Sequence, residues 1–357
     1  MFSFEDLMSA LQSVELSRSV LDISNPETVI LTGVPEKFSA VKNRLEAAGF
    51  VVHGCIDPFD QADLGIPSYS LKHVIPDLPL VFAGRPSKQW FNGVSKQMSR
   101  VFWFDPPGHN HQKMAYDPDF VINNYHALLR LYNDLADDES KSVLLSIVKA
   151  RFSGDAGYYL TADYAEYDHP TVKPLGGDIV IDAGAFDGDT AEQFSRAVGE
   201  QGRVISIEAS EHNFHKLCIR VAEQRLLNVI PVFGAVWSDM DLLNFSGSVE
   251  ASSMITKSGK DLVPAFTIDS LVDRLSLPKV DLIKMDIEGV EKDCLLGSVK
   301  TISKHLPKLQ ISAYHKNNDL WEIKDFLQST FEDRYRFYLG HHNYYHTETD
   351  LYCVKDV

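Results

Sequence analysis

Two acidic segments of this chain carry residues whose types and spacing could do chemistry. Residues 178–190 read DIVIDAGAFDGDT, an apolar strand that enters a glycine loop and then opens a helix. Residues 280–289 read VDLIKMDIEG, a second apolar strand that ends in an acidic turn. Ligands of open α/β sheets bind beyond the carboxyl ends of the strands. The two segments therefore predict one cleft that both strand ends share.

The glycine loop predicts close contact between backbone and ligand. Gly184 and Gly188 lack side chains, so the backbone around Ala185 can approach a bound molecule. Asp189 or Thr190 can cap the helix that follows. A dinucleotide site would show the pattern G-x-G-x-x-G, whereas this loop reads G-A-F-D-G-D. We take these residues as candidates for binding a different cofactor.

The acids around the loop indicate which cofactor that is. Asp182, Asp187 and Asp189 would repel a pyrophosphate, but they suit a ligand that carries an ammonium and a sulfonium group. S-adenosylmethionine is such a ligand. Glu208 ends the next strand, where its carboxylate can accept both ribose hydroxyls, although dehydrogenases share an acid at this position. We expect Asp182 and Glu208 to bind the cofactor.

The second acidic segment and the strand after it supply the candidates for catalysis. Lys284, Asp286 and Glu288 are expected to face one cleft, and Asp286 is also a candidate for cofactor binding. His315 falls at the carboxyl end of the next predicted strand, at the rim where ligands bind. The alternative for His315 is a histidine that only packs in the core. Glu291 is expected to be an acid on the surface of a helix.

At this point the chain resembles the FkbM family of methyltransferases. The resemblance rests on the ordered motifs IDAGAFDGDT, IEAS, DLIKMDIEGVE, ISAYH, DLWEI, YLGHH and TDLYCV. It implies a class I, Rossmann-like α/β fold around a mostly parallel sheet of seven strands, with S-adenosylmethionine as methyl donor. It also implies O-methylation of a hydroxyl on a sugar, a glycan or a natural product. Ala209 departs from the family, in which proline often follows the acid.

Residues beside the second and third strands complete the expected cofactor pocket. Ala209 follows the acidic end of the second strand, and Ala235 and Val236 lie beyond the third. Phe233 and Trp237 are candidates for lining the adenine pocket, and core packing explains these two aromatic residues equally well.

Methyl transfer to a hydroxyl places two demands on the site. The acceptor oxygen must be held close to the methyl carbon while competing water is excluded. A sugar hydroxyl is a weak nucleophile at neutral pH, so His315 or Asp286 would take its proton as the bond forms. In a second scheme, Asp286, Glu288 and a histidine hold Mg²⁺ or Mn²⁺, which lowers the pKa of the acceptor. His341 and His342 are weaker candidates for binding substrate or metal.

Length, charge and cysteine content narrow the class of protein. A chain of 357 residues exceeds the usual limit for one hydrophobic core and predicts two domains. The formal charge of −16 argues against binding to nucleic acid or to an anionic membrane, so we expect a small-molecule or glycan acceptor. The 4 cysteines lack paired spacing, and the amino terminus lacks the features of an export signal. We therefore expect a cytoplasmic protein without membrane insertion, and a homo-oligomer is compatible with this sequence.

The first half predicts a smaller Rossmann-like unit. A βαβ pattern opens it, with elements expected over residues 27–33, 37–48, 50–57, 80–84 and 101–107. Pro35 and Glu36 follow the first strand, where a bound phosphate would need free amides and no negative charge. We therefore predict a structural or substrate-selecting domain over residues 1–115, a helical connector over 116–170 and a methyltransferase domain over 171–357.

Two other functions stay open from the sequence. A dehydrogenase would need the glycine fingerprint that the loop lacks. The stronger alternative is a catalytically inactive S-adenosylmethionine-binding or scaffold protein, because the first half offers a module without evident catalytic residues. The intact Asp182, Asp286 and His315 favour an enzyme.

Overall fold

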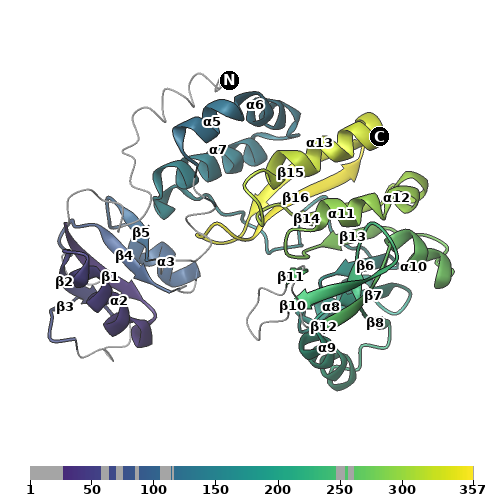
Figure 1. Cartoon of the computed structure of the whole chain (residues 1–357), viewed down its shortest axis with the longest axis horizontal. Helices are drawn as coiled ribbons and strands as arrows, with labels where there is room; N and C mark the ends of the chain where they lie inside the picture. The colour runs from purple at the N-terminus through teal and green to yellow at the C-terminus, as the bar shows by residue number, and fades with distance from the viewer. Residues whose placement is uncertain are drawn as a thin grey trace. The chain divides into compact units, whose positions relative to one another are not determined.

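The computed structural model describes residues 27–57, 64–69, 75–84, 88–104, 114, 116–246, 254–255 and 261–356 (Figure 1). The chain divides into two compact units. Unit 1 comprises Met1–Tyr132, Asp138–Ala162 and His341–Thr347, and unit 2 comprises Asn133–Asp137, Asp163–Gly340 and Glu348–Val357. The expected domain boundaries after residues 115 and 170 stay a prediction.

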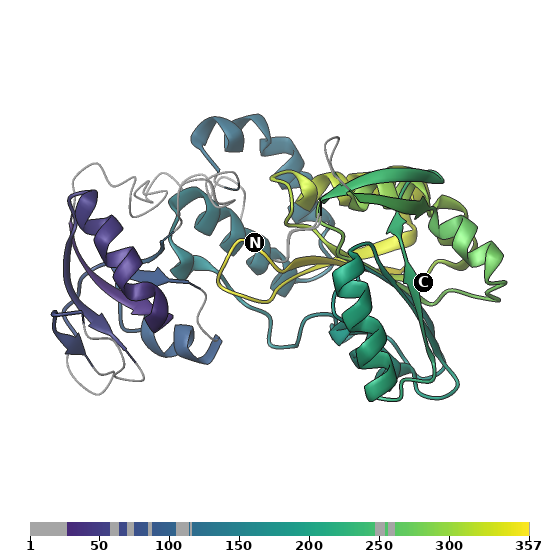
Figure 2. The ribbon, with the colours of Figure 1, turned by 60° about the horizontal axis from the view of Figure 1, so that its bottom comes forward.

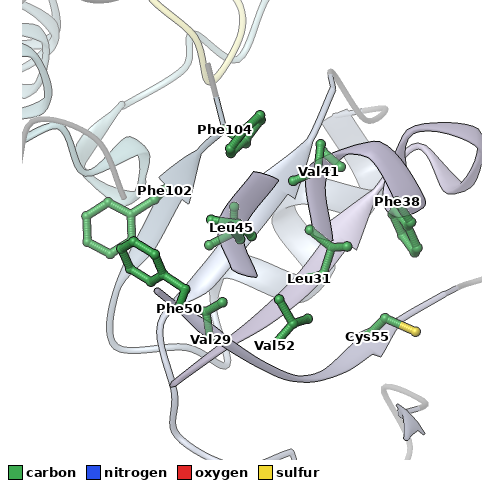
Figure 3. Packing of buried hydrophobic residues seen from close by; sticks show 12 residues of the cluster. Val29, Leu31, Phe38, Val41, Leu45, Phe50, Val52, Cys55, Phe102 and Phe104 are labelled. Carbon is green, nitrogen blue, oxygen red and sulfur yellow. The ribbon is translucent and has the colours of Figure 1, made fainter. Parts of the chain in front are cut away.

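Unit 1 holds a parallel sheet in the order β3-β2-β1-β4-β5. Its elements are β1 (Thr28–Gly33), α2 (Pro35–Ala47), β2 (Val51–Ile56), β3 (Ser68–Tyr69), β4 (Leu80–Ala83), α3 (Lys88–Ser95) and β5 (Val101–Trp103). Helix α2 packs Phe38, Val41 and Leu45 into one core cluster with Val29 and Leu31 of β1 (Figure 3). These elements follow the expected βαβ pattern, and residues 105–107 of the last expected strand lie outside the described residues.

Helices follow this sheet along the chain. They are α5 (Pro118–Asn123), α6 (Tyr125–Asp134), α7 (Asp138–Ser153) and the short 3₁₀-helix η2 (Ala156–Tyr158). Asp117 caps α5, because its side chain accepts a hydrogen bond from the Phe120 amide at 2.7 Å. The segment that we expected to be a helical connector is thus helical over much of its length.

Unit 2 is built on a seven-stranded sheet in the order β15-β16-β14-β13-β6-β7-β8. Its strands are β6 (Ile179–Ala183), β7 (Arg203–Glu208), β8 (Val229–Phe233), β13 (Leu282–Met285), β14 (Lys308–Ser312), β15 (Tyr335–His341) and β16 (Thr349–Lys355). The strands from β14 to β8 are parallel, and β16 is antiparallel to β14. The expected methyltransferase-like α/β fold is present, and its sheet is mixed.

Helices alternate with the parallel strands of unit 2. They are α8 (Asp189–Val198), α9 (Glu211–Glu223), α10 (Ile268–Arg274), α11 (Glu291–Leu296), α12 (Val299–His305), α13 (Asp319–Phe331) and the 3₁₀-helix η3 (Glu332–Arg334). Phe194 of α8 and Leu217 of α9 share a core cluster with Val180 and Val204 of the sheet. This packing leaves the carboxyl ends of β6, β7 and β13 at one edge of the sheet. Among the described residues, no helix is long and apolar enough to cross a membrane.

A smaller four-stranded sheet in unit 2 was not expected from the sequence. Its order is β11-β10-β12-β9, with β9 (Ala235–Val236), β10 (Asp241–Ser246), β11 (Met254–Ile255) and β12 (Asp261–Phe266). Strands β10 and β12 run side by side as an antiparallel pair (Figures 1 and 2). Strand β9 pairs with β12 in parallel and is buried. Strands of two residues are too short to show a hydrophobic period, which explains why they were missed.

Candidate functional site

The glycine loop and the acidic turn meet because β6 and β13 are neighbours. Lys284 on β13 is paired in register with Asp182 on β6. One residue beyond β13, the Asp286 amide donates to the Ala183 carbonyl at 3.1 Å. Gly184 has a φ of +79°, and a Cβ atom there would lie 1.8 Å from the Asp286 carbonyl oxygen. Only glycine therefore allows the two strand ends to approach this closely.

Asp182 and Lys284 form a buried ion pair beneath the loop. Their charged groups are 3.3 Å apart, and the Lys284 Nζ donates to the Gly184 carbonyl at 2.6 Å. Thr190 and Ser206 hydroxyls donate to the Asp182 carboxylate at 3.0 and 3.3 Å. Burial raises the pKa of Asp182, although Lys284 opposes this effect. These contacts anchor the loop, and direct contact of Asp182 with a cofactor or of Lys284 with a reacting group stays a prediction.

The rest of the loop is ordered by its own backbone and by α9. Gly188 has a φ of +91° and is the N-cap of α8, so Asp189 and Thr190 lie inside the helix and do not cap it, contrary to our expectation. Asp187 pairs with Arg220 at 3.1 Å, which offsets one of the negative charges of the loop. Ala185 is fully buried. The side chain of Asp189 is exposed to solvent.

Glu208 links the end of β7 to the glycine loop. Its carboxylate accepts hydrogen bonds from the Phe186 amide at 2.9 Å and from the Ser210 amide at 2.7 Å. Burial raises the pKa of Glu208, while these two amides act to lower it. The side chain therefore holds the loop beside the strand end where a ribose would bind. Its contact with the ribose hydroxyls stays a prediction.

The predicted pocket residues beyond β7 pack around one small cluster. Ala235 and Val236 are buried in β9, and Ala235 packs with β12. Ala209, Phe233 and Trp237 are partly buried against the same cluster. The structure thus brings these residues together next to the end of β7. Their contact with an adenine ring stays a prediction.

The turn after β13 has an unusual backbone. Glu288 has a φ of +58° and Gly289 a φ of +93°, so two successive residues adopt left-handed conformations. Such conformations cost free energy outside glycine and recur at functional sites. The turn directs Asp286 toward two tyrosines: Tyr167 donates to Oδ2 at 3.1 Å and Tyr314 to Oδ1 at 3.2 Å. Burial and then Asp286 raise the pKa of both phenols well above their ordinary value, so both remain donors at neutral pH.

His315 lies among three carboxylates at the end of β14. Its Nδ1 is 3.0 Å from Glu291, and its Nε2 is 3.5 Å from Asp286 and 3.6 Å from Glu288. Burial lowers the pKa of His315, but Glu291, Asp286 and Glu288 together raise it to about 10. His315 is therefore an imidazolium at neutral pH when these acids are ionised. The predicted convergence of His315 with Asp286 and Glu288 at two strand ends is present in the geometry.

Glu291 was expected on the helix surface, and that expectation is wrong. The residue is 1% exposed and accepts hydrogen bonds from the Ile287 amide at 3.1 Å and the Gly289 amide at 3.2 Å. Helix α11 begins at Glu291, so the first turn of this helix points into the acidic turn rather than to solvent. Glu291 thus joins the backbone of the turn to the imidazole of His315.

Two more acids complete this edge of the sheet. Burial raises the pKa of Glu288 to about 7, with Asp286 and Glu291 adding to the effect and His315 opposing it. Burial and Glu291 raise the pKa of Asp319 to about 6. One ligand atom each from Glu291, His315 and Asp319 lies within 4.8 Å of the others, a spacing that a metal ion could bridge. The predicted metal set contained Asp286 and Glu288 in place of Glu291 and Asp319.

Several residues around Asp286 were not predicted from the sequence. Burial and then Asp286 raise the pKa of Asp350 to about 8. Burial and then Asp350 raise the pKa of Glu166 to about 9. Asp350 belongs to the motif TDLYCV, so its acid was a signal that could have been used. Glu166 and Tyr167 precede every recognisable motif, and nothing in their local sequence marks them.

His341 and His342 fall in unit 1, whereas the residues described above belong to unit 2. His341 ends β15, is buried and stacks on Tyr159 with ring centroids 4.6 Å apart. His342 is half-buried. A role for either residue in binding substrate or metal stays a prediction.

Comparison with known proteins gives a family match for part of the chain. Residues 182–344 match the model of the methyltransferase FkbM domain. The matched stretch is less than half of the chain, and in it the chain is similar to the FkbM methyltransferases. A comparison with curated proteins found no match.

Known structures include one that resembles the whole chain. Methyltransferase FkbM from Methylobacillus flagellatus KT is 20% identical, with a TM-score of 0.67 and coverage of 98% of both chains, so the fold is shared. Aeropyrum pernix fibrillarin with bound S-adenosyl-L-methionine is 14% identical, with a TM-score of 0.34 over 50% of this chain and 67% of that one. The O-methyltransferase TomG from Streptomyces achromogenes is 9% identical, with a TM-score of 0.34 over 50% of this chain and 73% of that one.

Proposed function

We propose that this protein transfers a methyl group from S-adenosylmethionine to a hydroxyl of a sugar, a glycan or a natural product. The observation that carries the proposal is the convergence of His315, Asp286 and Glu288 beside the glycine loop. Charge supports a neutral acceptor, because a protein of formal charge −16 would repel nucleic acid and anionic surfaces.

The residues at the ends of β6 and β7 fit the cofactor. Gly184 and Gly188 give the loop left-handed turns without side chains, and Glu208 places a carboxylate beside the loop. When bound, S-adenosylmethionine supplies an electrophilic methyl group on a positively charged sulfur. The acidic surroundings, with Asp286 and Glu288 near the loop, favour a cationic ligand over a pyrophosphate.

The acceptor hydroxyl must lose its proton as the methyl group arrives. In our scheme the cluster of His315, Asp286 and Glu288 takes that proton. Tyr167 and Tyr314 donate to Asp286, so this carboxylate is held as an acceptor of fixed orientation. Glu288 is the most exposed of the three, at 35% for its side chain, and offers the first contact with a substrate hydroxyl. A base in this position contributes about 10² to 10⁴ in rate.

A metal-assisted scheme is the second candidate, and one observation favours it. Glu291, His315 and Asp319 bring three possible ligand atoms within 4.8 Å of one another. Hard cations such as Mg²⁺ or Mn²⁺ prefer carboxylate oxygens, and a cation here would lower the pKa of a nearby hydroxyl. The two schemes differ in whether a chelator removes activity.

Binding of the methyl donor is the first test. Replacing Glu208 by Ala removes a charged acceptor for the ribose hydroxyls, so we expect affinity for S-adenosylmethionine to fall about 10-fold or more. Calorimetry on the purified full chain measures this, with Glu211→Ala as control, because Glu211 is an exposed acid in the first turn of α9. Unchanged affinity of Glu208→Ala for S-adenosylmethionine would contradict the proposal that Glu208 binds the ribose hydroxyls.

Transfer is tested separately from binding. The full chain is incubated with S-adenosylmethionine labelled in the methyl group and with panels of sugars, glycans and hydroxylated natural products. Label on an acceptor oxygen is the expected result. Tight binding of the donor with no transfer to any acceptor would favour the alternative, an inactive S-adenosylmethionine-binding or scaffold protein.

A further inference from the structure

We propose that Tyr167 and Tyr314 form a clamp that positions the Asp286 carboxylate for the methyl transfer proposed above. The two phenols bind different oxygens of one carboxylate, Oδ2 at 3.1 Å and Oδ1 at 3.2 Å. A carboxylate held at both oxygens cannot rotate about its terminal bond without losing one of the two bonds. This inference rests on the proposed function and adds two residues to it.

Tyr167 comes from outside the matched domain, which begins at residue 182. Its φ of +62° is a left-handed conformation that costs free energy in a residue other than glycine. Gln310 on β14 holds this backbone by donating from Nε2 to the Tyr167 carbonyl at 2.8 Å. The Tyr167 amide also donates to the Tyr352 hydroxyl at 3.3 Å. These two hydrogen bonds hold a strained residue in a position from which its phenol reaches Asp286.

The clamp sets the direction in which Asp286 acts. Tyr314 precedes His315 in the chain, and their rings are 4.2 Å apart. The Oδ1 atom that accepts from Tyr314 is also the atom that lies 3.5 Å from His315 Nε2. Loss of either phenol lets the carboxylate turn and changes its distance to the imidazole. Tyr167 and Tyr314 are therefore positioning residues, because they reach the reaction only through Asp286.

Phenylalanine substitutions test the clamp with little change in shape. We expect Tyr167→Phe and Tyr314→Phe each to lower kcat about 10- to 100-fold, because each removes one hydrogen bond to a charged group. KM and the affinity for S-adenosylmethionine should change less than about twofold, since neither phenol is placed in the donor site. The double variant should lose less than the product of the two single losses, because both bonds act on one carboxylate.

Tyr335→Phe is the matched control. Its hydroxyl donates to the Pro307 carbonyl at 3.0 Å, so this variant also deletes a buried phenol hydrogen bond in unit 2, but one that does not contact Asp286. We expect unchanged kcat in Tyr335→Phe. An equal loss of kcat in the control and in the clamp variants, or unchanged kcat in both clamp variants, would overturn the proposal.

A spectroscopic readout separates this proposal from the proposed function. The imidazole nitrogen resonances of His315, assigned by their absence in His315→Gln, should shift in Tyr167→Phe and Tyr314→Phe and stay in place in Tyr335→Phe. This result is independent of turnover. A wild-type chain that transfers no methyl group would overturn the proposed function alone, whereas unmoved His315 resonances would overturn the clamp even in an active enzyme.

Discussion

His315 is surrounded by carboxylates, and this setting determines what its imidazole can do. Burial alone would lower its pKa, but Glu291, Asp286 and Glu288 raise it to about 10. A protonated imidazole cannot accept the proton of a hydroxyl by itself. It can balance the negative charge of the acids and pass a proton among them as the methyl group arrives.

Removal of the imidazole should therefore affect turnover more than donor binding. We expect His315→Ala to lower turnover about 10²-fold or more, with affinity for S-adenosylmethionine nearly unchanged. Steady-state kinetics and calorimetry measure the two effects. His305→Ala is the control, because His305 ends α12 and precedes the amino end of β14, whereas His315 follows the carboxyl end of that strand.

Adding a chelator distinguishes the scheme in which the cluster acts as a base from the scheme in which it holds a metal. If the cluster acts as a base, EDTA should leave the wild-type enzyme active. If the cluster holds a metal, EDTA should abolish activity, and Mg²⁺ or Mn²⁺ should restore it. Full activity of His315→Ala together with indifference to EDTA would contradict both schemes.

At the scale of elements, the parallel strands of the large sheet could be predicted, and the short strands of the small sheet could not. Buried parallel strands are continuous apolar runs, and β6 and β13 show such runs directly before their acids. Because ligands bind beyond the carboxyl ends of the strands, the two acidic strand ends were expected to share one cleft. The short strands β9 and β11 carry no period of their own, so their sheet depends on pairings that no local pattern reveals.

The errors within the candidate site have a similar cause. Glu291 was misplaced because an acid in the first turn of a helix usually faces solvent, and only the left-handed turn before α11 directs it inward. Tyr167 could not be found, because its place beside Asp286 depends on contacts with Gln310 and Tyr352, far along the chain. Local sequence predicts which acids end strands, whereas long-range packing decides what faces them.

Strand β16 brings an acid into this buried edge and makes stability depend on pH. Ser312 on β14 is paired in register with Asp350 and donates to its Oδ1 at 3.0 Å. Burial and then Asp286 raise the pKa of Asp350 to about 8, and Glu348 adds to this effect while Lys284 opposes it. An unfolded aspartate has a pKa near ~4. Protonation of Asp350 therefore stabilises the fold fully below about pH 4. This contribution is lost as the pH rises through about 8.

Replacing Asp350 by Asn should remove this loss, because the amide oxygen can still accept from Ser312 and carries no charge. We expect the free energy of unfolding of the variant, relative to wild type, to increase by about 2 kcal/mol between pH 6 and pH 9. Urea denaturation at both pH values measures this. Asp333→Asn, at an exposed acid in η3, should show no such change. A relative stability that does not vary with pH in Asp350→Asn would contradict the assignment.

At the scale of the whole molecule, the chain has two α/β units, and each could in principle bind a ligand that contains a nucleoside. In unit 1 the strand order reverses between β1 and β4, which is where open sheets of this kind bind ligands. Pro35 stands in the first turn of α2 and has no amide hydrogen, and Glu36 adds a negative charge beside it. The N-cap, Val34, offers no polar side chain either. This helix start is therefore poorly suited to a phosphate.

We predict that the full chain binds one S-adenosylhomocysteine and no dinucleotide. Calorimetry should give a stoichiometry near one for S-adenosylhomocysteine and no saturable heat for NAD or for a nucleotide sugar. The Glu208→Ala variant makes the result specific, because it weakens only the site in unit 2. Saturable NAD binding that persists in Glu208→Ala would place a nucleotide site in unit 1, and the charge argument from Glu36 would then be wrong.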